Sequence, residues 1–271
     1  MIDPNTGLQE KRTAAATEYW QGFSSSYNGL QVKLNRQFNN GLLITTAITW
    51  AKGLDYQTDD DGQYLFYINF QRNYARTDFD RAFTYVQSFV YQLPWGKGQR
   101  WMNSGLASRI LGNWEIAGII SAYSGIPFTL TVGGNNNDGG SLKAPANTQT
   151  PNQIAPVQIL GGINANPWFS TSSFAQPVGA VFGNVGRNTI SGPGLFDFNL
   201  SLFKDFKITE RWQFELRCDS FNLTNTPESN NPGTDITSST FGRVTGTLSS
   251  GTGVNGTGGG RALQLAAKLS F

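Results

Sequence analysis

The protein has 271 residues, of which 38% are hydrophobic and 13% aromatic, whereas only 14% are charged. The formal net charge of +2 is too small to indicate nucleic acid as a partner. The chain contains no histidine, which excludes a serine-histidine catalytic mechanism and removes the commonest metal ligand. We therefore expect neither enzymatic activity nor a bound cofactor or metal ion.

Two features of the sequence concern export and membrane insertion. No segment approaches the roughly 18 consecutive apolar residues of a membrane-spanning helix. Residues 1–7 lack the basic region and apolar core of a signal peptide. The chain has a single cysteine, Cys218, so it cannot form an internal disulfide.

Alternation of apolar and polar side chains predicts strands along the chain. Residues 11–22 offer a first strand, although their alternation is poor. Clearer alternation predicts seven further strands over residues 30–35, 44–50, 82–93, 112–123, 195–205, 211–221 and 261–271. The sequence therefore predicts an all-β fold of seven or eight strands.

The last strand has the most regular pattern. Leu263, Leu265 and Leu269 alternate with Gln264 and Lys268, and the strand ends at an aromatic residue, Phe271. Successive side chains of a strand point to opposite faces, so one face is apolar and the other polar over about the ten residues that cross a bilayer. This pattern is typical of the closing strand of an outer-membrane barrel.

The connections between the predicted strands alternate in length. Short turns are predicted at 38–41, 94–98 and 206–210, and long connections at 53–80, 124–194 and 223–260. The long connections are rich in Gly, Asn, Ser, Thr and Pro, and we expect them to be structureless loops. Tight periplasmic turns and long outer loops alternate in this way in outer-membrane barrels. The predicted fold is an antiparallel transmembrane β-barrel with long extracellular loops.

Aromatic residues are expected to form two belts at the rims of such a barrel. The periplasmic belt is predicted to contain Phe38, Trp95, Trp101, Phe203, Phe206, Trp212 and Phe271. The outer belt is predicted to contain Trp50, Phe79, Tyr123, Phe128 and Phe221.

Charged residues on one face of the predicted strands are the candidate functional side chains. In residues 211–221 the charged positions all fall on one side of the strand, which suits a water-filled interior. Either these groups contact a plug or a passing solute, or they only solvate the interior wall. The candidates for a lumen-facing role are Glu215, Arg217, Asp219, Arg211, Lys268, Asp197 and Lys33.

Several segments resemble one family of outer-membrane proteins. The most specific is Phe182-Gly-Asn-Val-Gly-Arg-Asn-Thr-Ile-Ser-Gly-Pro-Gly194, which leads into the strand that begins near Asp197. Matching segments occur in the same order at 27–32, 42–55, 221–225 and 241–243. Together they resemble the late-barrel region of Oar-like TonB-dependent outer-membrane proteins, from about Tyr27 to Phe271.

The resemblance implies a location in the outer membrane of a Gram-negative bacterium and a barrel of twenty-two strands. It also implies an N-terminal plug and a segment that engages TonB. The chain as a whole, residues 1–271, is then expected to be the C-terminal part of a transporter barrel. Its partners would be membrane lipid, the N-terminal barrel and plug, TonB through that N-terminal part, and a solute that the sequence does not identify.

Two architectures and several functions remain open at this stage. Eight strands could close into a narrow barrel, but we expect an incomplete, curved sheet, because the strands would be matched to a wider circumference. Transport of a large solute is the leading hypothesis. The alternatives are a structural or adhesive surface protein and a non-functional gene remnant.

Overall fold

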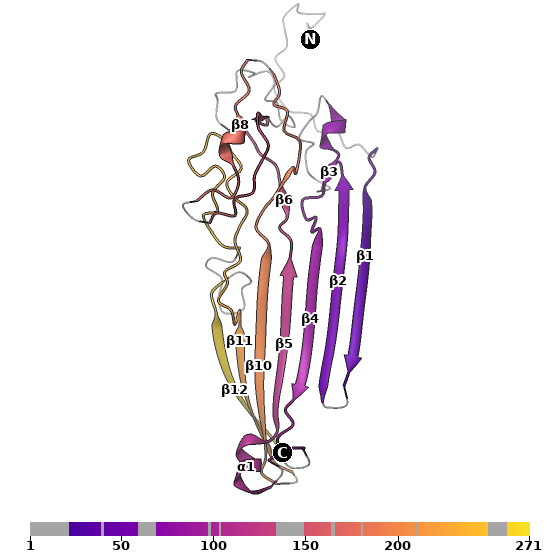
Figure 1. Ribbon diagram of the computed structural model, residues 1–271, viewed down its shortest axis with the longest axis vertical. Coiled ribbons are helices and arrows are strands. Elements are labelled where there is room, and N and C mark those ends of the chain that lie inside the picture. The colour runs from indigo at the N-terminus through magenta and orange to yellow at the C-terminus, as the bar shows by residue number, and fades with distance from the viewer. Residues whose placement is uncertain are drawn as a thin grey trace, which may run out of the picture.

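The computed structural model describes residues 22–38, 41–58, 69–96, 99–102, 104–133, 149–163, 166–179, 181–209, 211–248 and 259–271. One antiparallel sheet dominates it, with seven long strands in the order β1-β2-β4-β5-β10-β11-β12 and a short β3 beside β2 (Figure 1). Their bounds are β1 Ser26–Gln37, β2 Leu42–Asp55, β3 Ala75–Arg76, β4 Phe83–Gln92, β5 Trp114–Tyr123, β10 Leu195–Lys207, β11 Gln213–Phe221 and β12 Ala262–Ser270.

All seven of the clearly alternating segments are confirmed as strands. The first two are longer than predicted: β1 begins at Ser26 and β2 continues to Asp55. Small residues such as Gly29 and Gly53 hide the alternation there, although their backbones pair across the two strands. The weaker segment, 11–22, falls outside the described residues except for its last position.

The sheet is an open wall in the part of the chain that the structure describes. Each long strand pairs with the next long strand along the chain, from β1 to β12. The edge strands β1 and β12 do not pair with each other. The predicted all-β fold and the expectation of an incomplete barrel are both confirmed.

The register gathers the apolar side chains of all seven strands on one face. Leu202 of β10 is the Cα partner of Ile116 on β5 and of Cys218 on β11, and Cys218 is the partner of Leu265 on β12. Partners point to the same side of a sheet. We call this side the apolar face, and it carries Leu30, Val32, Ile44, Ile48, Trp50, Tyr85, Phe89, Ile116, Ile120, Phe198, Leu202, Phe214, Leu216, Leu265 and Leu269.

Much of the apolar face is open to its surroundings. Leu30 is 65% exposed and Leu265 is 81% exposed. The opposite side, which we call the polar face, carries Lys33, Thr45, Thr49, Ser88, Ser121, Asp197, Asn199, Ser201, Glu215, Arg217, Asp219, Gln264 and Lys268. On this face Asp219 is only 6% exposed. The sheet is therefore apolar on one face and polar on the other, and its exposed apolar face contrasts with the buried apolar faces of a water-soluble β-sandwich.

The connection between β4 and β5 differs from the prediction. A five-residue turn at 94–98 was expected, but the connection extends from Leu93 to Asn113 and contains helix α1, Gly105–Leu111. The backbone folds back on itself where Trp95 bridges Trp101 and where Gly96 and Gly112 approach closely. A helix of two turns is too short for a recognisable helical period, which is why alternation analysis missed it.

The long connections after β5 and β11 fold together into a unit that we call the cap. It holds the short pairs β6 (Pro127–Phe128) with β9 (Ile190–Ser191) and β7 (Asn152–Gln153) with β8 (Phe174–Ala175). The 3-10 helix η2, Thr171–Ser173, precedes β8, and η1, Phe70–Asn73, lies in the connection after β2. Backbone hydrogen bonds between Thr131 and residues 234 and 236 join the two connections. Figure 1 shows the cap at the end of the sheet opposite α1.

The cap has a hydrophobic core of its own. Phe169 is fully buried, and its ring lies 5.8 Å from that of Phe174 and 5.4 Å from that of Phe241. The buried cluster consists of Phe128, Leu130, Phe169, Phe174, Val185 and Ile190. The prediction of structureless loops is therefore wrong for these segments. The assignment of Phe128 to an outer aromatic belt is also wrong, because its ring lies in this core.

Two glycines of the segment 182–194 provide a matched test of cap packing. A Cβ on Gly183 would lie 1.9 Å from the carbonyl oxygen of Thr150, whereas one on Gly186 meets nothing closer than 3.7 Å. We expect Gly183→Ala to destabilise the cap by about 1–3 kcal/mol, the usual cost of overpacking, and Gly186→Ala to leave it nearly unchanged. Thermal melting of the two variants measures the difference, and equal melting temperatures would contradict the packing described.

Candidate functional site

A buried ion pair fastens the cap to the sheet. The Arg187 guanidinium, from the turn before β9, pairs with the carboxylate of Asp55 at the end of β2, and both side chains are at least nine-tenths buried. Arg187 also donates to the backbone carbonyls of Asp55 and Arg76, at 3.1 and 3.2 Å. A buried charge pair is more stable when further hydrogen bonds satisfy both groups. The Asp55 carboxylate accepts one more from the Thr58 hydroxyl at 2.8 Å, whereas the buried Nε of Arg187 has no hydrogen-bond partner among the described residues.

Neighbouring side chains extend this contact. Arg76 Nε lies 2.7 Å from Asp80 Oδ2, and its guanidinium also donates to the Ser191 hydroxyl at 2.7 Å. The other oxygen of Asp80 accepts from the backbone N–H of Gly53 on β2. Asn188, held at a positive φ of 54°, donates to the Arg76 carbonyl at 2.7 Å. We refer to Asp55, Arg76, Asp80, Arg187 and Asn188 as the cap clamp.

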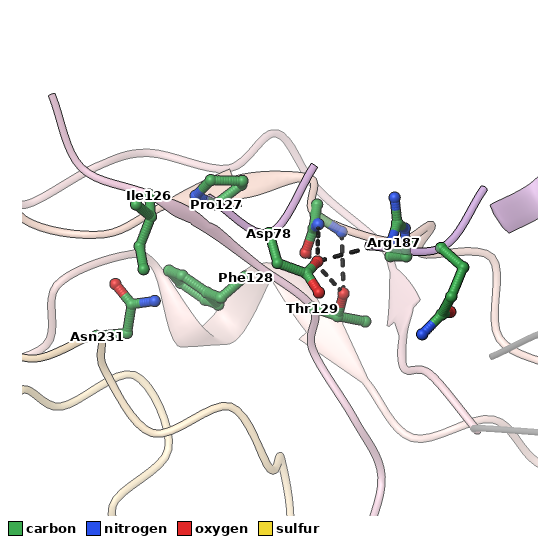
Figure 2. A pocket seen from close by; sticks show the side chains of 9 residues that line it. Asp78, Ile126, Pro127, Phe128, Thr129, Arg187 and Asn231 are labelled. Atoms are coloured by element: carbon green, nitrogen blue, oxygen red, sulfur yellow. Dashed lines mark hydrogen bonds and ion pairs between the residues drawn. The ribbon is translucent and has the colours of Figure 1, made fainter. Parts of the chain in front are cut away.

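An open cavity of about 390 Å³ lies beside the cap clamp. Figure 2 shows Asp78, Thr129 and Arg187 on one side of it, with Phe128 and Asn231 on the other. Asn188 is hydrogen-bonded to both Asp78 and Thr129, and Asp78 also pairs with Arg187. The cavity is lined by Gln57, Asp78, Ile126, Pro127, Phe128, Thr129, Arg187, Asn188 and Asn231. Its amide, carboxylate and hydroxyl groups suit a solute that forms hydrogen bonds.

A second polar cluster lies on the polar face, where β10, β11 and β12 meet. Arg217 Nε lies 2.7 Å from Asp219 Oδ1, and the Ser201 hydroxyl donates to the same oxygen at 2.6 Å. The Arg217 guanidinium also lies over the ring of Phe203, 5.0 Å from its centroid. This places Phe203 on the polar face, whereas a place in the periplasmic belt was predicted.

The structure places the predicted lumen-facing residues in four different positions. Glu215, Arg217 and Asp219 on β11 lie on the polar face, and Lys268 on β12 is the Cα partner of Glu215. Asp197 shares that face near the cap end of β10, where it accepts a hydrogen bond from Asn199. Lys33 has the same facing but lies on the far edge strand, β1, away from the others. Arg211 lies outside the strands, in the exposed turn between β10 and β11.

None of the five residues of the cap clamp was among the candidates predicted from the sequence. Arg187 and Asn188 stood inside the segment that carried the family resemblance, but their partners could not be inferred because Asp55 is 132 positions away. The only local signal for a buried ion pair was the position of Arg187, a charged residue in a glycine-rich segment. Arg72 was missed for the same reason, and its guanidinium donates to the carbonyls of Gly183 and Val185 at 2.7 and 2.9 Å.

Glu228 is a buried acid in the cap, only 9% exposed. Burial raises the pKa of its carboxyl, repulsion from Asp197 raises it further, and attraction to Arg81 acts in the opposite direction. The folded cap therefore holds this proton more tightly than the unfolded chain does.

The stability of the cap is expected to depend on pH through Glu228. Since its pKa is raised, ionisation costs more in the folded state, so stability falls as pH rises from the ordinary glutamate range through the raised value. Glu228→Gln should remove this loss and raise the melting temperature of the cap at neutral pH. Calorimetric melting over a pH series measures the effect, with the exposed Asp205→Asn as the control. A variant as sensitive to pH as the parent would contradict this role for Glu228.

Two observations concern other kinds of site. None of the helices in the described part of the chain is long and apolar enough to cross a membrane. Among the same residues, no group of three or more potential metal-ligating side chains occurs.

The fold and the two faces of the sheet define the class of protein. An antiparallel wall of seven long strands, apolar on one side and charged on the other, is the architecture of a transmembrane β-barrel. The family model for an outer membrane beta barrel domain matches residues 3–264, so the chain belongs to this family and is a protein of the Gram-negative outer membrane. No curated protein and no solved structure shows a significant match to the chain.

Proposed function

We propose that the chain is one wall of a TonB-dependent receptor that takes up a large solute, and that it has no enzymatic role. Its apolar face contacts lipid and its polar face lines the solute path. The plug, the remaining barrel strands and the contact with TonB belong to the N-terminal part of that receptor. The family resemblance of residues 27–271 supports this proposal, and so does the charge carried by the polar face.

The direction of the edge strands is the observation that carries the proposal. Six antiparallel pairings separate β1 from β12, so these two strands run in the same direction. Strand direction alternates around an antiparallel barrel, which requires an even number of strands. The seven long strands therefore need an odd number of further strands between β12 and β1. Every even-numbered barrel meets this requirement, and the family resemblance selects the twenty-two-stranded barrel of outer-membrane transporters among them.

The cap is well suited to capture a solute at the cell surface. Long connections face outward in outer-membrane barrels, so the cap end of the sheet is assigned to the outside. The buried core and the cap clamp give the cavity a preformed shape. Preformed sites bind with a smaller entropic cost than loops that must first become ordered.

Deletion in the producing bacterium tests the proposal. We expect a strain without this protein to lose growth on one large nutrient in a panel of such solutes, and a strain without TonB to lose growth on the same nutrient. The adhesive alternative predicts the opposite result, with normal growth on every nutrient and weaker attachment to surfaces or neighbouring cells. No change in growth or attachment would overturn the proposal and favour a gene remnant.

A further inference from the structure

Helix α1 lies at the end of the sheet opposite the cap (Figure 1) and is bonded there to side chains of the apolar face. Two side chains of that face bond to its last turn. The Trp114 indole N–H donates to the carbonyl of Ile110 at 3.3 Å, and the Lys204 ammonium donates to the carbonyls of Arg109 and Gly112. The C-terminal end of the helix is therefore fixed on the membrane-facing side of the wall.

The contacts of Lys204 explain why helix α1 is stable in this position on the apolar face. Its side chain is on the apolar face, where an unpaired charge would be costly, yet only 2% of the residue is exposed. Carbonyls at a helix C-terminus attract a cation, and the rings of Trp114 and Phe206 lie 5.7 and 4.8 Å from the ammonium. The helix thus covers a charge that would otherwise meet lipid.

The outer surface of the same connection is apolar and uncovered. Trp101 is 56% exposed, Met102 48%, Ile110 62% and Leu111 42%. These four residues form the apolar patch of a connection whose helix is bonded to the apolar face at the periplasmic end of the strands. Exposed large apolar groups of this kind mark an interaction surface.

Arginines stand next to the apolar patch. Arg100 precedes Trp101 and Arg109 precedes Ile110, and both arginines are exposed. Apolar groups flanked by cations are typical of segments that lie in the headgroup layer of a membrane. Guanidinium groups also bind phosphate well.

We propose that the β4–β5 connection is an interfacial anchor that binds glycerophospholipid in the periplasmic leaflet. Trp101, Ile110 and Leu111 enter the acyl-chain boundary, and Arg100 and Arg109 contact lipid phosphates. Continuity with the membrane-facing side of the sheet selects lipid, rather than a periplasmic protein, as the occupant. The anchor holds the periplasmic rim at a fixed depth in the bilayer.

Spin-label accessibility of the full chain in phosphatidylglycerol-containing vesicles tests the anchor. Cys218→Ser removes the native thiol, and single labels are placed at Ile110→Cys, Leu265→Cys and Val178→Cys. Leu265, 81% exposed on the apolar face, is the reference for lipid, and Val178, 89% exposed in the cap, is the reference for water. We expect the Ile110 label to collide with oxygen more often than the Val178 label and less often than the Leu265 label, because oxygen is most concentrated at the centre of the bilayer. Collision with a water-soluble nickel complex as often as at Val178 would overturn the proposal.

A second variant separates the phosphate contact from simple apolar burial. In the Ile110-labelled chain, Arg100→Gln together with Arg109→Gln should raise the frequency of collision with the nickel complex toward the value measured at Val178. An unchanged depth would overturn the assignment of these arginines to phosphate. Circular dichroism confirms in each case that the sheet is intact, so that a shift in depth is not mistaken for unfolding.

Discussion

Replacing Arg187 by alanine is expected to release the cap from the sheet. The substitution leaves the buried Asp55 carboxylate without its cationic partner. Removing one member of a buried ion pair typically costs about 3–5 kcal/mol, because the remaining charge stays desolvated. We expect a large drop in the melting temperature of the cap, measured by calorimetry, together with rapid proteolysis between β5 and β10.

Controls for Arg187→Ala come from the same cap. Arg243 is exposed, so Arg243→Ala should change stability by no more than a surface substitution does. The double variant Arg187→Ala/Asp55→Ala should be less destabilised than the sum of its single variants, because no buried carboxylate is left unpaired. Equal effects of Arg187→Ala and Arg243→Ala would show that the cap clamp does not hold the cap.

Placing a charge on the apolar face is the second change with a large expected effect. Leu265 lies near the middle of β12 and is 81% exposed on that face. An arginine on the lipid side of a barrel strand costs about 2–4 kcal/mol at the bilayer midplane. Leu265→Arg should therefore lower the free energy of unfolding from lipid vesicles, measured by urea titration, by an amount in this range.

The neighbouring residue supplies the matched control for Leu265→Arg. Gln264 precedes Leu265 on β12 and points to the polar face, beside Asp219 of β11. Gln264→Arg adds the same charge one position away, on the side that faces water, and should cost far less. Equal losses of stability in the two variants would be incompatible with an apolar face in lipid.

The strands and the facing of their side chains could be predicted from sequence because alternation is a local property. The two faces of a strand can be predicted from its own sequence, without knowing which strands pair with it. On β11, for example, Glu215 is assigned to the polar face and Leu216 to the apolar face. Membership of one antiparallel wall followed from the lengths of the connections. Alternation also predicts which face of the sheet Lys204 points to. Its contact with helix α1 could not be predicted, because alternation did not reveal that helix.

The cap could not be predicted because its stabilising contacts are distant in sequence. Phe169 packs on Phe241 across a strand hairpin, and Arg187 contacts Asp55 across 132 positions of the chain. Glycine-rich and polar segments lack a period, so composition alone suggested loops. Only the family resemblance marked residues 182–194 as special, and it did not say that they carry the cap clamp.

Spin-label scanning of β12 is the most direct test of the central claim that the two faces meet lipid and water. In the Cys218→Ser background, each position of Ala262–Ser270 is labelled in turn in the full chain reconstituted in vesicles. We predict a period of two, with high oxygen collision at Leu263, Leu265, Ala267 and Leu269 and high nickel collision at the positions between them. Uniform accessibility along the strand, or the opposite phase, would contradict this account.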